Sequence, residues 1–212
     1  MKQTFDIDWF IGYFDNFIDP KECDKIIEFF EQREKTNEIF DRSKSEKVEK
    51  KNRMDRNTFV NWKDMSLDQF SVNGEAHQGQ VALRTAVSVA LDLYIKETDI
   101  LNYIGCPEVH WTPYKLQKTK PGQGFHSWHC EMNGSIDYYN RVIVFTMYLN
   151  DIEEGGETEF LHFGKRVKAK KGRICFFPAY FPYVHRGNPP IGKTKYIVTG
   201  WFCCDPFMIH RR

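Results

Sequence analysis

His129 and Glu131 are the two residues whose types and spacing most directly indicate chemistry in this sequence. On extended chain, residues i and i+2 point to the same face, so this imidazole and this carboxylate can bind one ion from one side. A His-x-carboxylate pair with a second, distant His is the pattern of the two-His-one-carboxylate triad, which leaves coordination positions open on iron(II). His185 is the candidate for that second His. It lies next to a predicted strand and among aromatic residues, and we expect it to approach from the opposite side of a barrel.

Lys195, Ile197, Thr199 and Trp201 share parity on the last predicted strand, so they line one of its faces. A lysine on a face that lines a barrel is unusual, because a buried ammonium needs a partner. The carboxylate of a small molecule would supply that partner through a charge-assisted hydrogen bond. The residue pattern therefore indicates a metal site beside an anion site.

Composition limits the classes of protein to which the chain can belong. Its 212 residues suffice for one domain with a sizeable core, and 30 basic residues against 29 acidic ones do not indicate a nucleic-acid or membrane binder. None of the six cysteines forms a Cys-x-x-Cys spacing, and only Cys203 and Cys204 are close in sequence, where bridging is rare. With no recognisable signal peptide, we expect free thiols and a cytoplasmic location.

The N-terminal half is predicted to be largely helical. The aromatic run at 5–14 predicts one strand, and Asp19 followed by Pro20 predicts a helix start, with apolar spacing that continues the helix to about residue 32. A second amphipathic helix is predicted over 80–96, packed on the outside of a sheet. Residues 41–56 are charged and nearly lack apolar anchors, which predicts either a solvated loop or a lid over a bound substrate.

From residue 109 onward, short β-prone runs alternate with turn residues, which is typical of a sandwich or barrel. We therefore predict a mainly β fold with flanking helices (α+β) and a single domain over 1–212. In that domain a strand and helical support region (1–107) precedes a β-barrel core (108–205). The predicted strands are 109–117, 141–150, 157–161, 166–169, 173–177, 183–186 and 195–203.

The segment from Phe125 to Phe202 resembles the catalytic domain of the 2-oxoglutarate- and iron(II)-dependent dioxygenases, in their prolyl 4-hydroxylase-like branch. The run that begins at Tyr13 resembles the entry to the same domain, so the similarity extends over most of the chain outside roughly 34–78. The matching segments occur in the family's order and at its spacing: His129–Glu131, Arg141–Asp151, Gly155–Phe160, Lys171–Phe177, His185 and Gly192–Trp201.

The resemblance implies a double-stranded β-helix (jelly-roll) core with named site residues. His129, Glu131 and His185 match the iron ligands, and Lys195 matches the basic residue that pairs with the distal carboxylate of 2-oxoglutarate. Tyr148 matches a tyrosine that hydrogen-bonds the same carboxylate, and Thr199 occupies a supporting position. Strand parity agrees, because it predicts that Tyr148 shares one face with three residues of its strand, Val142, Val144 and Thr146.

The implied activity is hydroxylation of an unactivated C–H bond, with a prolyl residue of a peptide or protein as the leading substrate. Iron(II), 2-oxoglutarate, dioxygen and ascorbate are the implied cofactor and small-molecule partners, and succinate and carbon dioxide the implied products. This sequence departs from the family at Glu131, where relatives usually carry Asp, and at Thr119 and Lys120, near which many relatives carry Tyr. Arg141 and Arg186 are candidate groups on the substrate side.

Two alternatives remain open at the level of sequence. A zinc hydrolase could use the same His129, Glu131 and His185, because two His and one Glu also suit catalytic zinc. A non-catalytic jelly-roll module could retain the pocket for binding alone. For the oxygenase itself, another amino-acid side chain or a small metabolite is the alternative substrate. His126 precedes His129 by three positions and lacks a carboxylate two residues on, so we do not expect it to bind the metal.

Overall fold

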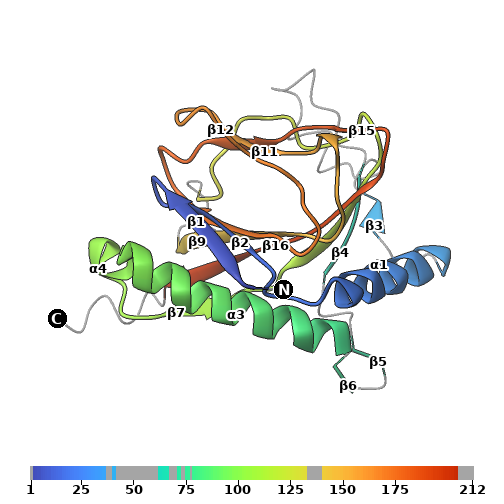
Figure 1. Ribbon diagram of the computed structural model, residues 1–212, viewed down its shortest axis with the longest axis horizontal. Helices are drawn as coiled ribbons and strands as arrows, with labels where there is room; N and C mark the ends of the chain where they lie inside the picture. The colour runs from blue at the N-terminus through green and yellow to red at the C-terminus, as the bar shows by residue number, and fades with distance from the viewer. Residues whose placement is uncertain are drawn as a thin grey trace.

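The computed structural model describes residues 2–36, 40–41, 62–66, 71–72, 75–76, 78–132 and 140–204. Most of the charged run at 41–56, for which a lid was one interpretation, lies outside these residues. Within them the fold is mainly β, with helices on one side (Figure 1).

One large antiparallel sheet forms the floor of the molecule. Its strand order is β1-β2-β13-β9-β16-β8-β4-β3, and β7 also pairs with β16. The strands are β1 (Thr4–Asp8), β2 (Ile11–Asp15), β3 (Phe40–Asp41), β4 (Trp62–Ser66), β7 (Val109–Trp111), β8 (Lys115–Thr119), β9 (Arg141–Tyr148), β13 (Ile174–Pro178) and β16 (Lys195–Cys204).

Smaller sheets lie above this floor (Figure 1). The strand order of the three-stranded sheet is β12-β11-β14, and a separate pair is formed by β10 and β15. These strands are β10 (Glu154–Gly155), β11 (Thr158–Phe160), β12 (Lys165–Val167), β14 (His185–Gly187) and β15 (Pro190–Ile191). A further short pair joins β5 (Ser71–Val72) to β6 (Glu75–Ala76).

The helices cover the side of the large sheet that faces away from the small sheets (Figure 1). Helix α1 (Pro20–Lys35) begins where predicted, because the Asp19 side chain accepts from the Lys21 backbone N–H at 2.9 Å and Pro20 opens the helix. Helix α3 (Gln78–Thr98) buries the predicted face, including Leu83, Val87 and Tyr94, and is followed by the short α4 (Ile100–Ile104).

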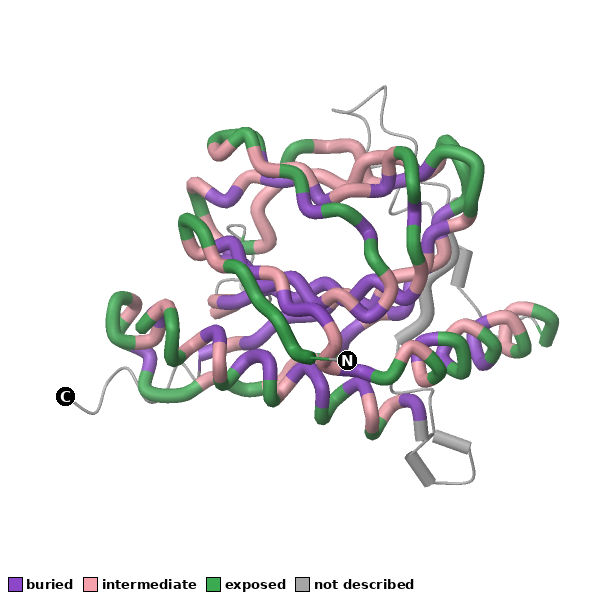
Figure 2. The backbone as a smooth tube through the Cα atoms, viewed as in Figure 1, coloured by how far each residue is buried: buried purple, intermediate pink, exposed green. Residues whose placement is uncertain are grey.

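The large sheet separates two apolar clusters. The helix-side cluster joins α1 and α3 to the lower face of the sheet, with Phe145, Phe176 and Phe202 among its buried residues. The barrel-interior cluster lies between the two sheets and contains Tyr148 and Trp201. Buried residues accordingly follow the large sheet and the sides of the helices that face it (Figure 2).

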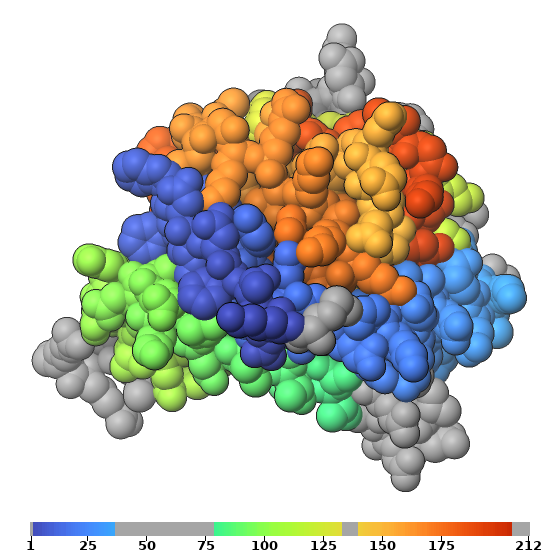
Figure 3. Space-filling view, in the orientation of Figure 1, coloured from blue at the N-terminus to red at the C-terminus, as the bar shows by residue number. Residues whose placement is uncertain are grey.

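This arrangement is a double-stranded β-helix with helical support, as predicted. The N-terminal region is not separate from the core sheet, because β2 pairs with β13 and β4 pairs with β8. In the space-filling view the first hairpin, in dark blue, lies between the helices in green and the residues around 160–185 in orange (Figure 3). The division at 107/108 stays a prediction.

Two strand predictions were wrong in detail. The run at 5–14 is a hairpin of β1 and β2 rather than one strand, because Trp9 and Phe10 take positive φ angles of 51° and 60° at its turn. Aromatic residues are not the usual signal for such a turn, which normally uses Gly, Asn or Asp. The run at 109–117 is divided into β7 and β8, because Pro113 lacks the backbone N–H that a continuous strand requires.

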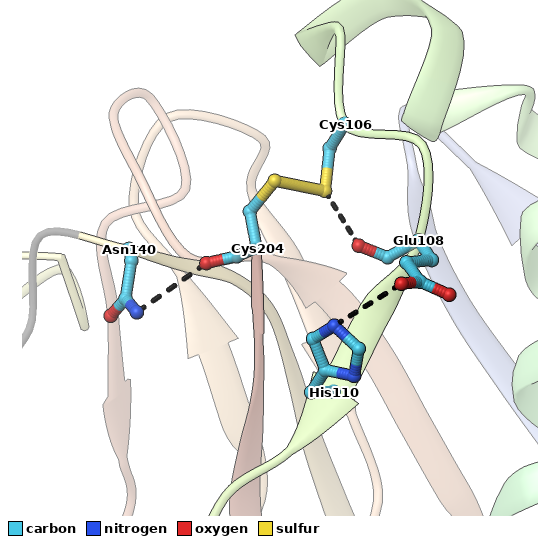
Figure 4. Close-up of a disulfide and its surroundings, with 5 residues drawn as sticks. All are labelled: Cys106, Glu108, His110, Asn140 and Cys204. Atoms are coloured by element: carbon cyan, nitrogen blue, oxygen red, sulfur yellow. Dashed lines mark hydrogen bonds and ion pairs between the residues drawn. A yellow bond between two sulfur atoms is a disulfide. The ribbon is translucent and has the colours of Figure 1, made fainter. Parts of the chain in front are cut away.

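A disulfide joins Cys106, after α4, to Cys204 at the end of β16 (Figure 4). The two Cα atoms are 6.0 Å apart, within the usual range for such a bridge. Four cysteines are free, namely Cys23, Cys130, Cys175 and Cys203. The sequence did not reveal this pair, because its members are 98 positions apart and only β16 and β7 bring them together. The cytoplasmic location stays a prediction.

In the part of the chain that the structure describes, no helix has the length and apolar character required to cross a membrane.

The disulfide predicts a stability that depends on reductant. Closing a loop of roughly 100 residues stabilises a protein by about 4–5 kcal/mol in the chain-entropy model, which corresponds to a midpoint shift of about 10 °C for a chain of this size. We expect Cys204→Ser, or dithiothreitol, to lower the thermal midpoint by about that amount. Cys203→Ser is the matched control and should keep the sensitivity to reductant. A midpoint unchanged by reductant would contradict the prediction.

Candidate metal centre

His129 and His185 are neighbours across a backbone bridge. The N–H of each residue donates to the carbonyl of the other, at 3.1 and 3.0 Å, which makes an isolated antiparallel bridge. Directly opposed residues of such a pair present their side chains on the same side, and here the ring centroids are 4.4 Å apart. The expectation that His185 approaches from the opposite side of the barrel was wrong, because the two histidines lie side by side.

The segment that carries Glu131 is not a regular strand, and Glu131 itself lies at a bend. The bridge at His129 fixes one end, and the Met132 backbone N–H donates to the Ala179 carbonyl at 2.9 Å to fix the other. Glu131 therefore points to the same side as His129, as the i, i+2 spacing predicts. Its Oε1 lies 3.3 Å from His129 Nε2 and 3.6 Å from His185 Nε2.

Both histidines are held in the tautomer that metal binding requires. His129 Nδ1 lies 2.8 Å from the Ser127 carbonyl and His185 Nδ1 lies 3.0 Å from the Tyr183 carbonyl. A carbonyl oxygen only accepts, so each Nδ1 carries a proton, and each Nε2, which points toward Glu131, is the nitrogen that a metal would take. Burial lowers the pKa of His185.

The carboxylate of the triad is ionised. Burial by itself raises the pKa of Glu131, but hydrogen bonds and charge from His129 and His185 hold that pKa well below its usual range. The three side chains offer ligand atoms that all lie within 4.8 Å of one another. Two imidazoles and one carboxylate on one side of a site form the donor set of the facial triad, so these residues fit iron(II).

Lys195 lies in the barrel interior beside the strand of His185. Its Nζ donates to the Gly156 carbonyl at 3.1 Å and more weakly to the Asn188 carbonyl at 3.5 Å. The residue is only 4% exposed, and it forms no ion pair with any carboxylate among the described residues. Burial lowers its pKa to about 8, and the charge of Glu157 only partly opposes that effect. A buried ammonium with only carbonyl partners fits an anionic ligand.

The other predicted residues share this interior face. Thr199 pairs with Thr146, and their hydroxyls are 3.4 Å apart. Tyr148 is fully buried, with its hydroxyl 2.6 Å from Thr158 Oγ1. The structure therefore places Lys195, Tyr148 and Thr199 on the interior face of the large sheet. Their contacts with a cosubstrate stay predictions.

The sequence placed Trp201 on the same strand face as Lys195 and indicated no function for it. The structure shows that its indole Nε1–H is a buried hydrogen-bond donor without a partner among the described residues. An unpaired buried donor is costly, and a ligand oxygen can satisfy it. No signal in the sequence distinguishes such an indole from one with a partner.

Arg186 and His126 lie near the triad but contribute elsewhere. The guanidinium of Arg186 donates to Glu159 at 2.8 and 3.0 Å and stacks over the Trp128 ring, which accounts for its position without a substrate. His126 Nδ1 lies 3.3 Å from the Gly187 carbonyl. His126 lies outside the cluster formed by His129, Glu131 and His185, and its lack of a metal-binding role stays a prediction.

Comparison with known proteins agrees with this geometry. Residues 114–203 match the family model described as the 2OG-Fe(II) oxygenase superfamily. Over 162 residues the chain is 25% identical to probable prolyl 4-hydroxylase 9 of Arabidopsis thaliana, an alignment that covers 60% of this chain and 56% of that protein. The chain thus spans little more than half of the length of that relative.

Solved structures share the fold over most of the chain. The viral collagen prolyl hydroxylase of Paramecium Bursaria Chlorella virus-1, in its 2-oxoglutarate complex, aligns with a TM-score of 0.62 at 19% identity, over 92% of this chain and 97% of that chain. A prolyl hydroxylase of Trichoplax adhaerens, in complex with a hypoxia inducible factor peptide, aligns with a TM-score of 0.64 at 17% identity, over 92% and 83%.

The fold is similar to that of solved prolyl hydroxylases, and residues 114–203 match the model of the 2OG-Fe(II) oxygenase superfamily. Iron(II) and 2-oxoglutarate are the cofactor and cosubstrate of that superfamily. His129, Glu131 and His185 fit the first, and the buried ammonium of Lys195 fits the second.

The geometry predicts that metal binding requires both histidines but not His126. We expect His185→Ala to weaken Mn²⁺ binding to the isolated protein by at least 100-fold, because it removes one of three ligands. Isothermal titration calorimetry with Mn²⁺ measures the effect without turnover. The matched control is His126→Ala, which should retain wild-type affinity. Tight binding by the His185 variant would contradict the triad.

Proposed function

We propose that this protein is a 2-oxoglutarate- and iron(II)-dependent dioxygenase that hydroxylates an unactivated C–H bond, with a prolyl residue of a peptide or protein as substrate. The observation that carries the proposal is the position of the triad beside a buried, carboxylate-free ammonium. Lys195 Nζ lies near β14, the strand that carries His185. A Cβ atom placed on Gly187 of that strand would be 3.8 Å from the Lys195 Nζ. The triad and the buried ammonium therefore lie close to the same short strand, which supports a metal site beside an anion site.

The chain's own residues bind and orient the reactants. His129, His185 and Glu131 hold the metal from one side and leave the other side to ligands. Lys195 pairs with the distal carboxylate of 2-oxoglutarate, and this contact is strong because water is excluded from it. Tyr148 can accept a hydrogen bond from Thr158 and direct its own O–H to the same carboxylate.

Iron(II) with 2-oxoglutarate supplies the oxidising chemistry: one oxygen atom of dioxygen enters succinate, formed with carbon dioxide, and the other enters the substrate. The aromatic rings around the ligands keep the site rigid. The Phe125 ring lies 4.4 Å from that of His129, and the Phe177 ring lies 4.6 Å from that of His185. Rigid positioning of the ligands is the protein's part in such a reaction.

The choice of a prolyl peptide rests on relatives. The curated relative from Arabidopsis thaliana is a probable prolyl 4-hydroxylase, and the Trichoplax adhaerens structure contains a bound peptide. Mass spectrometry tests the substrate. The protein is incubated with iron(II), 2-oxoglutarate, ascorbate and proline-rich peptides, and matched peptides with alanine at each proline serve as controls. We expect a gain of one oxygen on proline only, with equimolar succinate.

A gain of oxygen on another residue would reassign the substrate and keep the reaction. Absence of 2-oxoglutarate consumption with iron(II) and every peptide would contradict the oxygenase itself. Hydrolysis of a substrate with zinc and without 2-oxoglutarate would instead support the zinc alternative.

The role of Lys195 predicts a loss of cosubstrate binding. Lys195→Ala removes a charge-assisted hydrogen bond worth about 1.5–3 kcal/mol, so we expect the KM for 2-oxoglutarate to rise roughly 10- to 150-fold. Succinate release measured against 2-oxoglutarate concentration checks the result. Lys170→Ala is the control, since Lys170 is an exposed lysine that pairs with Asp15 at 3.1 Å. An unchanged KM in the Lys195 variant would exclude the ion pair.

The lowered pKa of Lys195 also predicts a pH dependence. The ligand-free ammonium loses its proton as pH rises through about 8, so affinity for 2-oxoglutarate is full below that pH and falls above it. The dissociation constant should rise up to about tenfold per pH unit. Lys195→Arg stays charged and should remove the dependence below pH 10. Equal affinity of the wild type at pH 7 and 9.5 would contradict this assignment.

A further inference from the structure

A β-bulge at the start of β9 decides which face Arg141 occupies. In the antiparallel pairing with β16, Phe202 pairs with Ile143, but the next residue, Cys203, pairs with Arg141. Val142 is therefore an extra residue on β9. An extra residue of this kind breaks strict alternation and turns the neighbouring side chain to the other face of the sheet.

The contacts on each face confirm the change of side. Val142 and Ile143 are consecutive, yet both pack against the helix-side cluster. The expectation that Val142 shares a face with Val144 was therefore wrong. Arg141 instead lies on the interior face, where its guanidinium stacks over the Trp201 ring with Cζ 3.7 Å from the ring centroid. Without the bulge, alternation would direct Arg141 toward the helices.

On the interior face, Arg141 contacts the carboxylate of the metal triad. Its Nη1 donates to Glu131 Oε2 at 3.3 Å, and both side chains are largely buried, with 14% and 17% exposed. The other oxygen, Oε1, is the one that faces His129 and His185. The two oxygens of Glu131 therefore have different partners: Oε2 faces the guanidinium and Oε1 faces the histidines.

This contact restrains the orientation of the Glu131 carboxylate. A glutamate has one more rotatable bond than the aspartate usual at this position, so its carboxylate can take more orientations. The stacked guanidinium of Arg141 is itself fixed by the Trp201 ring, and a fixed donor on Oε2 removes much of that freedom.

We infer that Arg141 is a positioning residue for Glu131: it holds Oε2 so that Oε1 alone is presented to the metal. The inference rests on the metal site proposed above and adds to it a residue that the three-ligand cluster does not contain. Arg141 acts through Glu131, as outer partners of metal ligands do in other metalloproteins.

Metal affinity tests the inference without turnover. Mn²⁺ is titrated calorimetrically into the wild type, Arg141→Gln and Arg141→Lys. Loss of an outer partner typically costs 10- to 100-fold in metal affinity, and we expect a loss in that range for the Gln variant. Arg141→Lys keeps the charge but not the planar stacking, so its affinity should lie between the two. Co²⁺ absorption, which reports ligand geometry, should change in the Gln variant.

Arg173→Gln is the matched control. The Arg173 side chain is equally buried at 14%, donates to Asp15 at 2.8 Å, and stacks over Tyr13 at 4.3 Å. The carboxylate that Arg173 contacts, that of Asp15, is not one of the proposed metal ligands. This variant should lower the thermal midpoint and leave Mn²⁺ affinity and the Co²⁺ spectrum unchanged.

The outcomes separate the two levels of the proposal. A wild type that binds no Mn²⁺ would overturn the metal site itself. A wild type that binds Mn²⁺, with equal affinity in folded Arg141→Gln, would overturn only the role of Arg141. Equal losses in the Arg141 and Arg173 variants would show a structural effect and would also overturn it. If the Gln variant does not fold, wild-type affinity and an unchanged Co²⁺ spectrum in Arg141→Lys would overturn the inference.

Discussion

The reciprocal backbone hydrogen bonds between His129 and His185 are the interaction on which the rest of the site depends. They join an irregular segment to β14 and place two imidazoles side by side. From that bridge, the i, i+2 relation brings Glu131 to the same side, and two carbonyls orient both rings so that Nε2 points toward it. One short bridge and a few local hydrogen bonds thus bring the candidate metal ligands together.

The two faces of the large sheet differ in character. The helix-side face is apolar and packs against α1 and α3. The interior face carries Lys195, Thr199, Tyr148 and Trp201; Lys195 has only carbonyl partners, and the Trp201 indole N–H has none among the described residues. Burying such groups costs free energy, and a bound ligand can recover that cost. Apolar packing on the helix-side face thus helps to offset the free-energy cost of the buried polar groups on the interior face.

Several features of the site could be read from residue order because they depend on short-range geometry. The His129–Glu131 spacing, the parity of Lys195 and Thr199, and the capped start of α1 all follow from local chain periodicity. Other features could not be read in this way. The bulge at Val142 reverses the face of Arg141, and the turn at Trp9 uses residues that rarely adopt positive φ. The bulge appears only in the pairing of β9 with β16, which is distant in the sequence.

The sequence by itself determined the donor set of the metal centre and the class of the fold, because residue types, order and short spacings are sufficient for both. Only the tertiary structure decided that His185 is the immediate neighbour of His129, that Cys106 meets Cys204, and that Arg141 contacts Glu131. These relations join residues that are distant in the chain or cross a break in strand alternation. They depend on how segments far apart in the sequence pair, which short-range spacing does not specify.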